Sequence, residues 1–376
     1  MKILVAGDYS PKFRLEKLLE NKDYSAIFGE VEPFIQRADL SIVNFESVIR
    51  HPNQNTITKL GSCLSCNENA IDALKWAGFN VITLANNHSM DYGSNGLEIT
   101  LDTAHKAGIR TVGAGMNLDE AKRILYHSKD DFTIGIINCC EHEFSIADQN
   151  EAGANPLDLI SQYESIQDAK EKADYIIVIV HGGHEHFQLP SLRMQDTYRH
   201  FINLGADAVI NHHQHCFSGY EMYKGKPIFY GLGNFCFDEK THVNPTLWIE
   251  GYMVELDIQQ DNTSFKLIPY IQCSDEPKIS LLNDKSSFYQ RIQELNKTIT
   301  IREKLIENLD NYYSAHQKAI LSVVEPYVSR LGKSLYFRGI LPDLINQKKA
   351  LTLLNKINCE SHLDKLQFVL RKLVFK

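Results

Sequence analysis

The amino-acid sequence predicts a layered α/β fold followed by a helical extension. Over the first two-thirds of the chain, short apolar runs rich in β-branched residues alternate with amphipathic stretches of helical length, a pattern typical of sheets covered by helices. Three of the helical stretches end at a glycine, which readily adopts the left-handed conformation just past a helix. Beyond about Asp257 the character changes to Lys- and Glu-rich sequence with helical periodicity.

The predicted strands are short apolar runs, and the predicted helices repeat their apolar residues every three or four positions. The strands are Lys2–Ala6, Leu40–Asn44, Val81–Ala85, Thr111–Val112, Phe132–Cys139, Tyr175–Val180, Ala208–Asn211, Pro227–Tyr230, Gly251–Ile258 and Phe265–Gln272. The helices are Ala70–Ala77, Gly96–Ala107, Ser161–Ala173 and Leu192–Leu204, three of which precede Gly78, Gly108 and Gly205.

The sequence predicts a boundary near residue 280, between an α/β domain of residues 1–280 and a helical extension of residues 281–376. Helical sequence runs from Ser286 to Ser314, and prolines and glycines break residues 316–376 into three or four short helices. Seven Lys or Arg residues against three acids make residues 343–376 basic and amphipathic. We expect this end to pack on the first domain, or to contact an anionic membrane surface or a biosynthetic complex.

Composition and charge exclude several classes of protein. The apolar fraction of 43% and the charged fraction of 23% are ordinary for a soluble globular chain. The formal net charge of -8 provides no basic field for nucleic acid, so an anionic substrate must be held locally by a metal or a small pocket. The sequence shows no signal-peptide pattern and no run of about 18 apolar residues. It therefore predicts a cytoplasmic protein with reduced cysteines, in which the Cys63-x-x-Cys66 pair is part of a loop.

Polar residues that can bind metal stand at the carboxyl ends of five predicted strands. In open α/β sheets ligand sites lie at these ends, so we expect the acids, amides and imidazoles to converge at one edge. The segments are Gly7-Asp8, Asn44-Phe45-Glu46, Asn86-Asn87-His88, His181 to Glu185, and Asn211-His212-His213-Gln214-His215.

The mixture of donors indicates a hydrolytic centre with one or two divalent metal ions. Carboxylate and amide oxygens suit Mg, Mn or Fe, imidazoles suit Mn, Fe or Zn, and no cysteine belongs to the set. One carboxylate can hold two cations roughly 3.5–4 Å apart, so that they clamp a phosphoryl group and activate a water molecule. Glu46 is the candidate for that bridge.

Six motifs connect these residues to a known family. They are Gly7-Asp8, Asn44-Phe45-Glu46, Asn86 to Gly93, His181-Gly182-Gly183-x-Glu185, Gly205 to His215, and Tyr230 to Phe235. Their order and spacing resemble those of the CapA-type proteins of poly-γ-glutamate and capsule synthesis, a branch of the calcineurin-like metallophosphoesterases. The resemblance covers residues 1 to about 240 and implies a four-layer sandwich of two mixed β-sheets flanked by helices.

The resemblance also implies a ligand set for two metals. The second metal-binding position of typical members is an imidazole, whereas this sequence has Ser10, so one metal would be bound weakly or not at all. His212 is the alternative to His213 as a ligand, and His184 and His186 either face the same cleft or lie on the surface. The implied ligands are Asp8 and His215 for the weaker position, Asn87, His181 and His213 for the firmer one, and Glu46 between them.

Two further groups of residues receive roles from the resemblance. His88 would act as a general acid or phosphate contact, with Asp91 orienting its ring. Asn44, Glu185 and Asn234 would contact the substrate. For Asn44 a hydrogen bond near the site is the alternative, and Glu185 could instead hold its own loop through an Arg.

The resemblance therefore predicts a metal-dependent phosphoester hydrolase in capsule or other surface-polymer synthesis, acting on an anionic small molecule or polymer. Three alternatives stay open. One is a component of poly-γ-glutamate synthesis that binds polymer or assists amide formation. The second is metal-assisted epimerisation of a peptide residue, in which His88 moves the proton. The third is a binding protein with a degenerate metal site.

Overall fold

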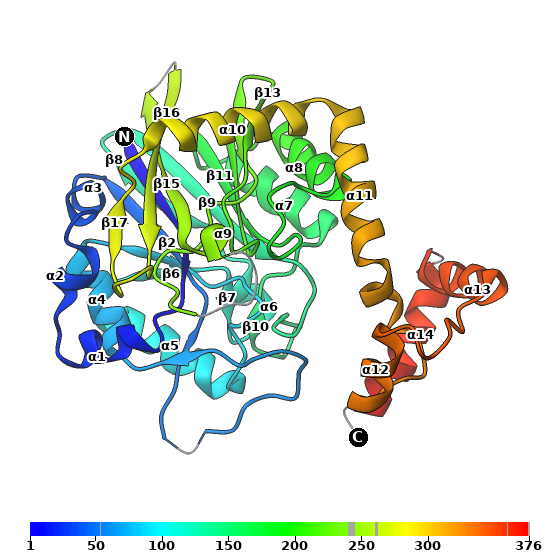
Figure 1. Cartoon of the computed structure of the whole chain (residues 1–376). Helices are drawn as coiled ribbons and strands as arrows, with labels where there is room; N and C mark the ends of the chain where they lie inside the picture. Colours follow the sequence, from blue (N-terminus) through cyan, green and yellow to red (C-terminus); the bar gives the residue numbers. More distant parts are fainter. Residues whose placement is uncertain (53, 240–244, 260–261, 359, 375–376) are drawn as a thin grey trace. The chain divides into compact units, whose positions relative to one another are not determined.

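The computed structural model describes the whole chain except residues 53, 240–244, 260–261, 359 and 375–376. By its internal contacts the chain forms two compact units, Met1–Leu305 and Ile306–Lys376. The first unit contains two large sheets and most of the helices (Figure 1). The described residues of the second unit form helices and their connections.

The first large sheet is mixed. Its seven strands are β1 (Lys2–Tyr9), β2 (Leu40–Phe45), β5 (Val81–Thr83), β6 (Arg110–Val112), β15 (Glu250–Gln259), β16 (Asn262–Gln272) and β17 (Ile279–Leu281). They lie in the order β17-β16-β15-β1-β2-β5-β6. The four strands from β1 to β6 are parallel, and β15, β16 and β17 are joined antiparallel to them and to one another.

The second large sheet is also mixed. Its six strands are β8 (Leu125–Lys129), β9 (Phe132–Cys140), β11 (Tyr175–His181), β12 (Ala208–His212), β13 (Tyr220–Tyr223) and β14 (Lys226–Phe229). They lie in the order β13-β14-β12-β11-β9-β8. The four central strands are parallel, whereas β8 and β13 are antiparallel edge strands.

The two sheets pack face to face, and helices cover their outer faces. Buried Ile3 and Ile42 of the first sheet share one apolar core with Ile136, Ile177 and Ile210 of the second. The helices α1 (Arg14–Glu20), α2 (Tyr24–Phe28), α3 (Glu32–Gln36), α4 (Asn69–Ala77) and α5 (Gly93–Lys106) pack on the first sheet, and α7 (Leu159–Lys170) and α8 (Leu192–Leu204) pack on the second (Figure 1). The predicted four-layer sandwich is thus confirmed.

Local sequence signals account for several helix ends. Asp158 and Ser191 cap α7 and α8 by accepting hydrogen bonds from backbone N–H groups three residues later. Gly78 and Gly205 follow α4 and α8 with φ of 103° and 126°, values at which a side chain would be strained. The predicted glycine stops are therefore confirmed.

Some elements differ from the sequence-based expectation. The sequence does not predict edge strands β8 and β13, because both are too polar to show as apolar runs. The helical sequence from Ser286 to Ser314 is broken at Ile301, whose φ of -98° and ψ of 103° are extended. The break follows β-branched residues, which lose side-chain freedom in a helix. It separates α10 (Lys285–Thr300) from α11 (Arg302–Leu321).

The contacts divide the chain later than the predicted boundary near residue 280. Phe288 and Ile292 of α10 are buried in the core between the sheets, which makes α10 part of the first unit. The second unit holds α12 (Arg330–Phe337), α13 (Gln347–Asn358) and α14 (Glu360–Val374). No helix in the described part of the chain is long and apolar enough to cross a membrane.

The remaining elements are short and connect the layers. They are β3 (Val48–Ile49), β4 (Ser65–Cys66), β7 (Ala114–Gly115), β10 (Gly153–Ala154), α6 (Leu118–Ala121) and α9 (Pro245–Ile249). The pair β3 and β4 brackets the loop that carries Lys59.

Candidate metal centre

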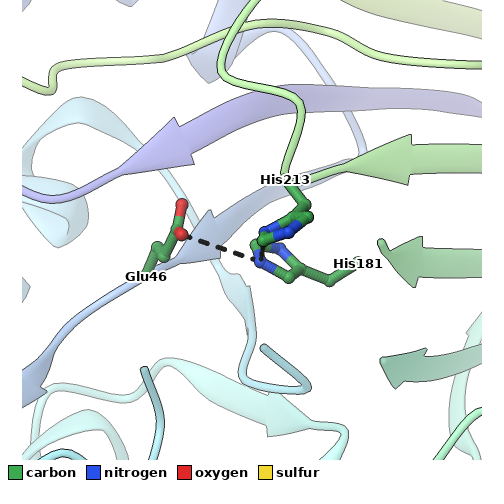
Figure 2. Close-up of side chains that lie close together, drawn as sticks. All are labelled: Glu46, His181 and His213. Carbon is green, nitrogen blue, oxygen red and sulfur yellow. Dashed lines mark hydrogen bonds and ion pairs between the residues drawn. The ribbon is translucent and has the colours of Figure 1, made fainter. Parts of the chain in front are cut away.

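The carboxyl ends of parallel strands from both sheets meet at the candidate centre. Asp8 is the last residue but one of β1 in the first sheet, and Glu46 directly follows β2. In the second sheet His181 ends β11, and His213 directly follows β12. Figure 2 shows the carboxylate of Glu46 facing the two imidazole rings. The expected convergence therefore occurs, but at neighbouring edges of two sheets rather than at one edge.

One group of ligand atoms comes from Glu46, His181 and His213. The three offered atoms lie within 4.8 Å of one another. His181 Nε2 is 3.6 Å from Glu46 Oε1 and 2.9 Å from His213 Nδ1 (Figure 2). Asn87 Oδ1 lies 3.0 Å from the same His181 nitrogen. Asn87, His181 and His213 are the residues expected to hold the more tightly bound metal, and Glu46 is the expected bridging ligand.

A second group comes from Asp8, Glu46 and His215. His215 Nδ1 is 3.7 Å from Asp8 Oδ2, and His215 Nε2 is 3.7 Å from Glu46 Oε1. Glu46 thus belongs to both groups, which is the geometry of a bridging carboxylate.

Ser10 and His212 have buried polar atoms without a hydrogen bond among the described residues. Ser10 is fully buried, and its Oγ has no hydrogen-bond partner among the described residues. His212 Nδ1 lies 3.2 Å from Asp8 Oδ1, but neither ring nitrogen has a well-oriented hydrogen bond within the described chain. His213, and not His212, contributes to the candidate ligand groups.

The electrostatics of the centre fit a divalent cation. Both oxygens of Glu46 are buried without a hydrogen bond from any described residue. Burial, together with Asp8, Glu185 and Asp91, raises the pKa of Glu46 well above its usual value. Such a carboxylate is stable as an anion only beside a positive charge.

The imidazoles are in the form that binds metal. Burial, followed by the repulsion from neighbouring imidazoles, brings the pKa of His181 well below its usual value. Burial also lowers the pKa of His215 to about 4, although Asp8 opposes this shift. Both rings are therefore neutral at pH 7 and offer a lone pair to a cation.

His88 stands beside the ligand groups. Its Nε2 is 3.8 Å from Glu46 Oε1, and its Nδ1 is 2.6 Å from Asp91 Oδ2. Burial lowers the pKa of His88, although Asp91 acts in the opposite direction. Asp91 is fully buried, so its carboxylate holds the ring in one orientation.

Lys59 is part of this network, and sequence reasoning missed it. Its side chain is 2% exposed, and its ammonium forms an ion pair with Asp91. Lys59 Nζ also lies 3.2 Å from the carbonyl oxygen of Asn87 and 3.2 Å from His88 Nδ1. The backbone N–H of Leu64 donates to Asp91 at 2.5 Å. A single Lys within a polar loop carries no motif, so nothing in the sequence singled it out.

Two predicted substrate contacts lie behind the ligands. Asn44 Nδ2 donates to Asp8 Oδ1 at 2.8 Å and lies 3.2 Å from His181 Nδ1. Asn234 is fully buried, and its Oδ1 lies 2.9 Å from His215 Nδ1. This geometry favours the orientation of ligands over contact with a substrate.

The remaining candidates lie around the rim or away from the centre. The side chain of Glu185 is half exposed. The ring of His186 lies near the ligand His215, with 6.0 Å between the ring centroids. His184 packs near Phe187. No cysteine joins the ligand groups found in the described chain, and burial raises the pKa of the Cys66 thiol to about 12.

Comparison with known proteins places this site in a family. The model of the family described as bacterial capsule synthesis protein PGA_cap matches residues 2–239. The chain belongs to this family. The expected resemblance to CapA-type proteins is thereby confirmed, and the match spans every residue of the candidate centre.

Two relatives illustrate the membership. The PGA biosynthesis protein CapA of Bacillus subtilis is 33% identical over 237 residues, which are 62% of this chain and 62% of that protein. The capsule biosynthesis protein CapA of Bacillus anthracis is 28% identical over 298 residues, or 77% of this chain and 72% of that protein. The chain thus covers less than two thirds of the length of the B. subtilis relative.

Solved structures similar to this chain include two described by phosphatase-type names. One is a putative 5'-nucleotidase from Staphylococcus aureus in complex with alpha-ketoglutarate, with 18% identity, a TM-score of 0.47, and coverage of 78% of this chain and 58% of that one. The other is a phosphatase from Mycoplasma pneumoniae, with 17% identity, a TM-score of 0.42, and coverage of 72% and 93%.

Proposed function

We propose that this protein is a divalent-metal-dependent phosphoester hydrolase that acts in capsule or other surface-polymer synthesis. The observation that carries the proposal is Glu46, whose buried and unpartnered carboxylate belongs to two groups of ligand atoms. This geometry suits a bridge between two cations. Membership of the capsule synthesis family supports the biological half of the proposal.

One or two ions of Mn, Fe, Zn or Mg would be held by the two ligand groups. Asn87, His181 and His213 would hold one, Asp8 and His215 the other, with Glu46 between them. When bound, these ions would polarise a phosphoryl oxygen and lower the pKa of a water molecule that attacks phosphorus.

His88 is the proton donor in this proposal. Its Nδ1 faces Asp91, so its Nε2 is directed toward the centre, 3.8 Å from Glu46 Oε1. If the ring of His88 is an imidazolium, its Nε2 would give a proton to the leaving oxygen. If the ring is neutral with its proton on Nε2, it would donate a hydrogen bond to a phosphate oxygen. Lys59 and Asp91 hold the ring for either task.

A second candidate function is binding of an anionic polymer within a synthesis complex. It is favoured by the names of the Bacillus relatives, which refer to PGA or capsule biosynthesis. A cavity of about 710 Å³ whose lining includes Lys12 and Arg50, together with Glu16 and Glu20, offers room for such a chain. In both proposals the partner is an anionic molecule other than nucleic acid.

The proposal also includes where the protein acts and what its last helices contact. We place the protein in the cytoplasm, where residues 306–376 would contact a membrane surface or a biosynthetic complex through the basic helices near the end of the sequence.

The test is to measure bound metal and the hydrolysis of aryl phosphate mono- and diesters, with and without Mn²⁺. His181→Ala should lose both metal and activity. His88→Ala should keep metal and lose activity by a factor of about 10²–10⁴. His105→Ala, an exposed position on α5, is the matched control and should behave like the parent.

Two results would separate the candidates. A parent protein that binds no metal and hydrolyses neither ester would refute the hydrolase. A parent that binds metal and a glutamate polymer, yet hydrolyses neither ester, would favour the second candidate.

A further inference from the structure

Glu185 lies at the solvent side of the candidate centre. It stands four residues after His181, on the loop between β11 and α8. Its side chain is 52% exposed, whereas those of Asp8, Glu46 and His215 are at most 8% exposed. Glu185 is therefore an acidic side chain that is exposed to solvent, beside a set of ligands that are buried.

The Glu185 carboxylate forms a third group of ligand atoms with His213 and His215. One oxygen of Glu185 and one nitrogen of each ring lie within 4.8 Å of one another. His213 belongs also to the group with His181, and His215 to the group with Asp8. The carboxylate thus lies where the two metal positions adjoin.

Other roles for Glu185 have little support in its contacts. Within the described part of the chain, no Lys or Arg forms an ion pair with it, and Arg193 of the following helix pairs with Glu141. The nearest ion-pair partner is His186, whose Nε2 is 4.0 Å from Glu185 Oε2. That distance is too long for a hydrogen bond, so an Arg that would hold this loop through Glu185 is not observed among the described residues.

The ligand group of Asp8 needs a further donor. Asp8, Glu46 and His215 supply three atoms, whereas divalent zinc and magnesium ions in proteins take about four to six ligands. Ser10, which stands at the position expected for an imidazole, offers only a neutral hydroxyl. The Glu185 carboxylate, whose oxygen lies within 4.8 Å of a ring nitrogen of His215, would supply a charged donor from the solvent-exposed side.

We propose that Glu185 is a metal ligand that completes the weaker position and replaces the donor that Ser10 does not provide. The inference rests on the proposed function insofar as both require a metal centre. The negative charge of the Glu185 carboxylate would also compensate part of the positive charge of two divalent ions, for which the two ligand groups otherwise supply only the carboxylates of Asp8 and Glu46. Because Glu185 is exposed, this position would exchange its ion with solvent more readily than the buried one.

The experiment compares the parent with Glu185→Gln and with Glu143→Gln, an exposed acid on the neighbouring loop as a matched change of charge. Each protein is freed of metal, titrated with Mn²⁺, and followed by bound-metal analysis and by the electron paramagnetic resonance of coupled ions. Parent and Glu143→Gln should bind two ions per chain, with a coupled signal. Glu185→Gln should keep the tight ion and bind the second at least tenfold more weakly, with loss of the coupled signal.

The outcomes separate this inference from the proposed function. Two equally tight ions and an unchanged coupled signal in Glu185→Gln would overturn the role of Glu185 while leaving the metallohydrolase intact. A parent that binds neither Mn²⁺ nor any of the other proposed ions, Fe²⁺, Zn²⁺ and Mg²⁺, would overturn both. Circular dichroism of Glu185→Gln should match the parent, because the replaced side chain is 52% exposed and glutamine has nearly the same shape.

Discussion

Burial determines the chemistry of single residues in the candidate centre. Glu46 has no hydrogen bond from the described residues, so its carboxylate lacks the hydrogen bonds that would stabilise its charge in water. His181 and His215 are neutral for the same reason, because burial disfavours the charged ring. A bound cation would compensate the charge of the carboxylate and would accept the free lone pairs of the two rings.

Glu46→Gln should therefore have opposite effects with and without metal. Because the pKa of Glu46 is raised in the folded protein, metal-free folding at neutral pH either leaves this carboxyl charged without a partner or makes it take up a proton. Glutamine carries neither cost, so the metal-free variant should have a free energy of unfolding about 1–4 kcal/mol higher than the metal-free parent and should melt at a higher temperature. Addition of Mn²⁺ should stabilise the parent and leave the variant almost unchanged. Thermal melts with and without chelator measure both effects, with Glu98→Gln, an exposed acid on α5, as control. Equal stabilisation of parent and Glu46→Gln by Mn²⁺ would contradict the bridging role.

Lys59→Met should impair both the fold of the loop and the action of His88. Loss of the ammonium leaves the fully buried Asp91 carboxylate with the Leu64 N–H and His88, at a cost of about 3–5 kcal/mol. Asp91 would be held less firmly, and with it the ring of His88, so we expect kcat for ester hydrolysis to fall at least tenfold while bound metal stays constant. Lys75→Met, an exposed position on α4, is the control. The expectation fails if both variants match the parent in melting temperature and kcat.

At the scale of elements, the buried parallel strands could be predicted and the edge strands could not. β9 and β11 are covered on both faces, so their sequences are continuous apolar runs. β8 has half-exposed residues and pairs on one side only, which leaves a polar sequence with little periodicity. The same limit explains Lys59, since its loop is positioned by the Asp91 network and not by a local pattern.

Strand β1 depends on a glycine for its approach to the Tyr230–Phe235 motif. A Cβ atom on Gly7 would lie 1.9 Å from the carbonyl oxygen of Gly233, and Asp8 N–H donates to that same oxygen at 3.1 Å. Gly7→Ala should therefore force the two segments apart and lower the free energy of unfolding by about 1–3 kcal/mol or more.

The displacement in Gly7→Ala should also reach the metal centre, because Asp8 is the next residue. We expect weaker Mn²⁺ binding together with a lower urea midpoint. Gly135→Ala on β9 is the matched change, since its Cβ would approach Ala173 no closer than 3.3 Å. Similar urea midpoints for the two variants would show that the close approach of Gly7 to Gly233 does not limit stability.

At the scale of the whole molecule, the site requires both sheets. Asp8 and Glu46 come from the first sheet, and His181, His213 and His215 come from the end of strands in the second. Strand ends, together with the family resemblance carried by the motifs, predicted which of these side chains would lie near one another. Their pairing across the sheets, the inward-facing amides of Asn44 and Asn234, and the position of Glu185 depend on packing between distant segments, which no local pattern records.

The packing of α10 predicts where the chain can be shortened. Phe288 contacts Phe217 and Tyr252 in the core between the sheets, and the Ile299 carbonyl accepts a hydrogen bond from Gln195 of α8. A chain of residues 1–321 keeps these contacts and should melt within a few degrees of the full protein and bind Mn²⁺ equally well. A chain of residues 1–281, cut next to the boundary expected near residue 280, loses Phe288 and Ile292, each worth about 1.5–3 kcal/mol of burial. It should aggregate or unfold at a much lower temperature, and a stable, metal-binding 1–281 chain would show that α10 is dispensable to the domain.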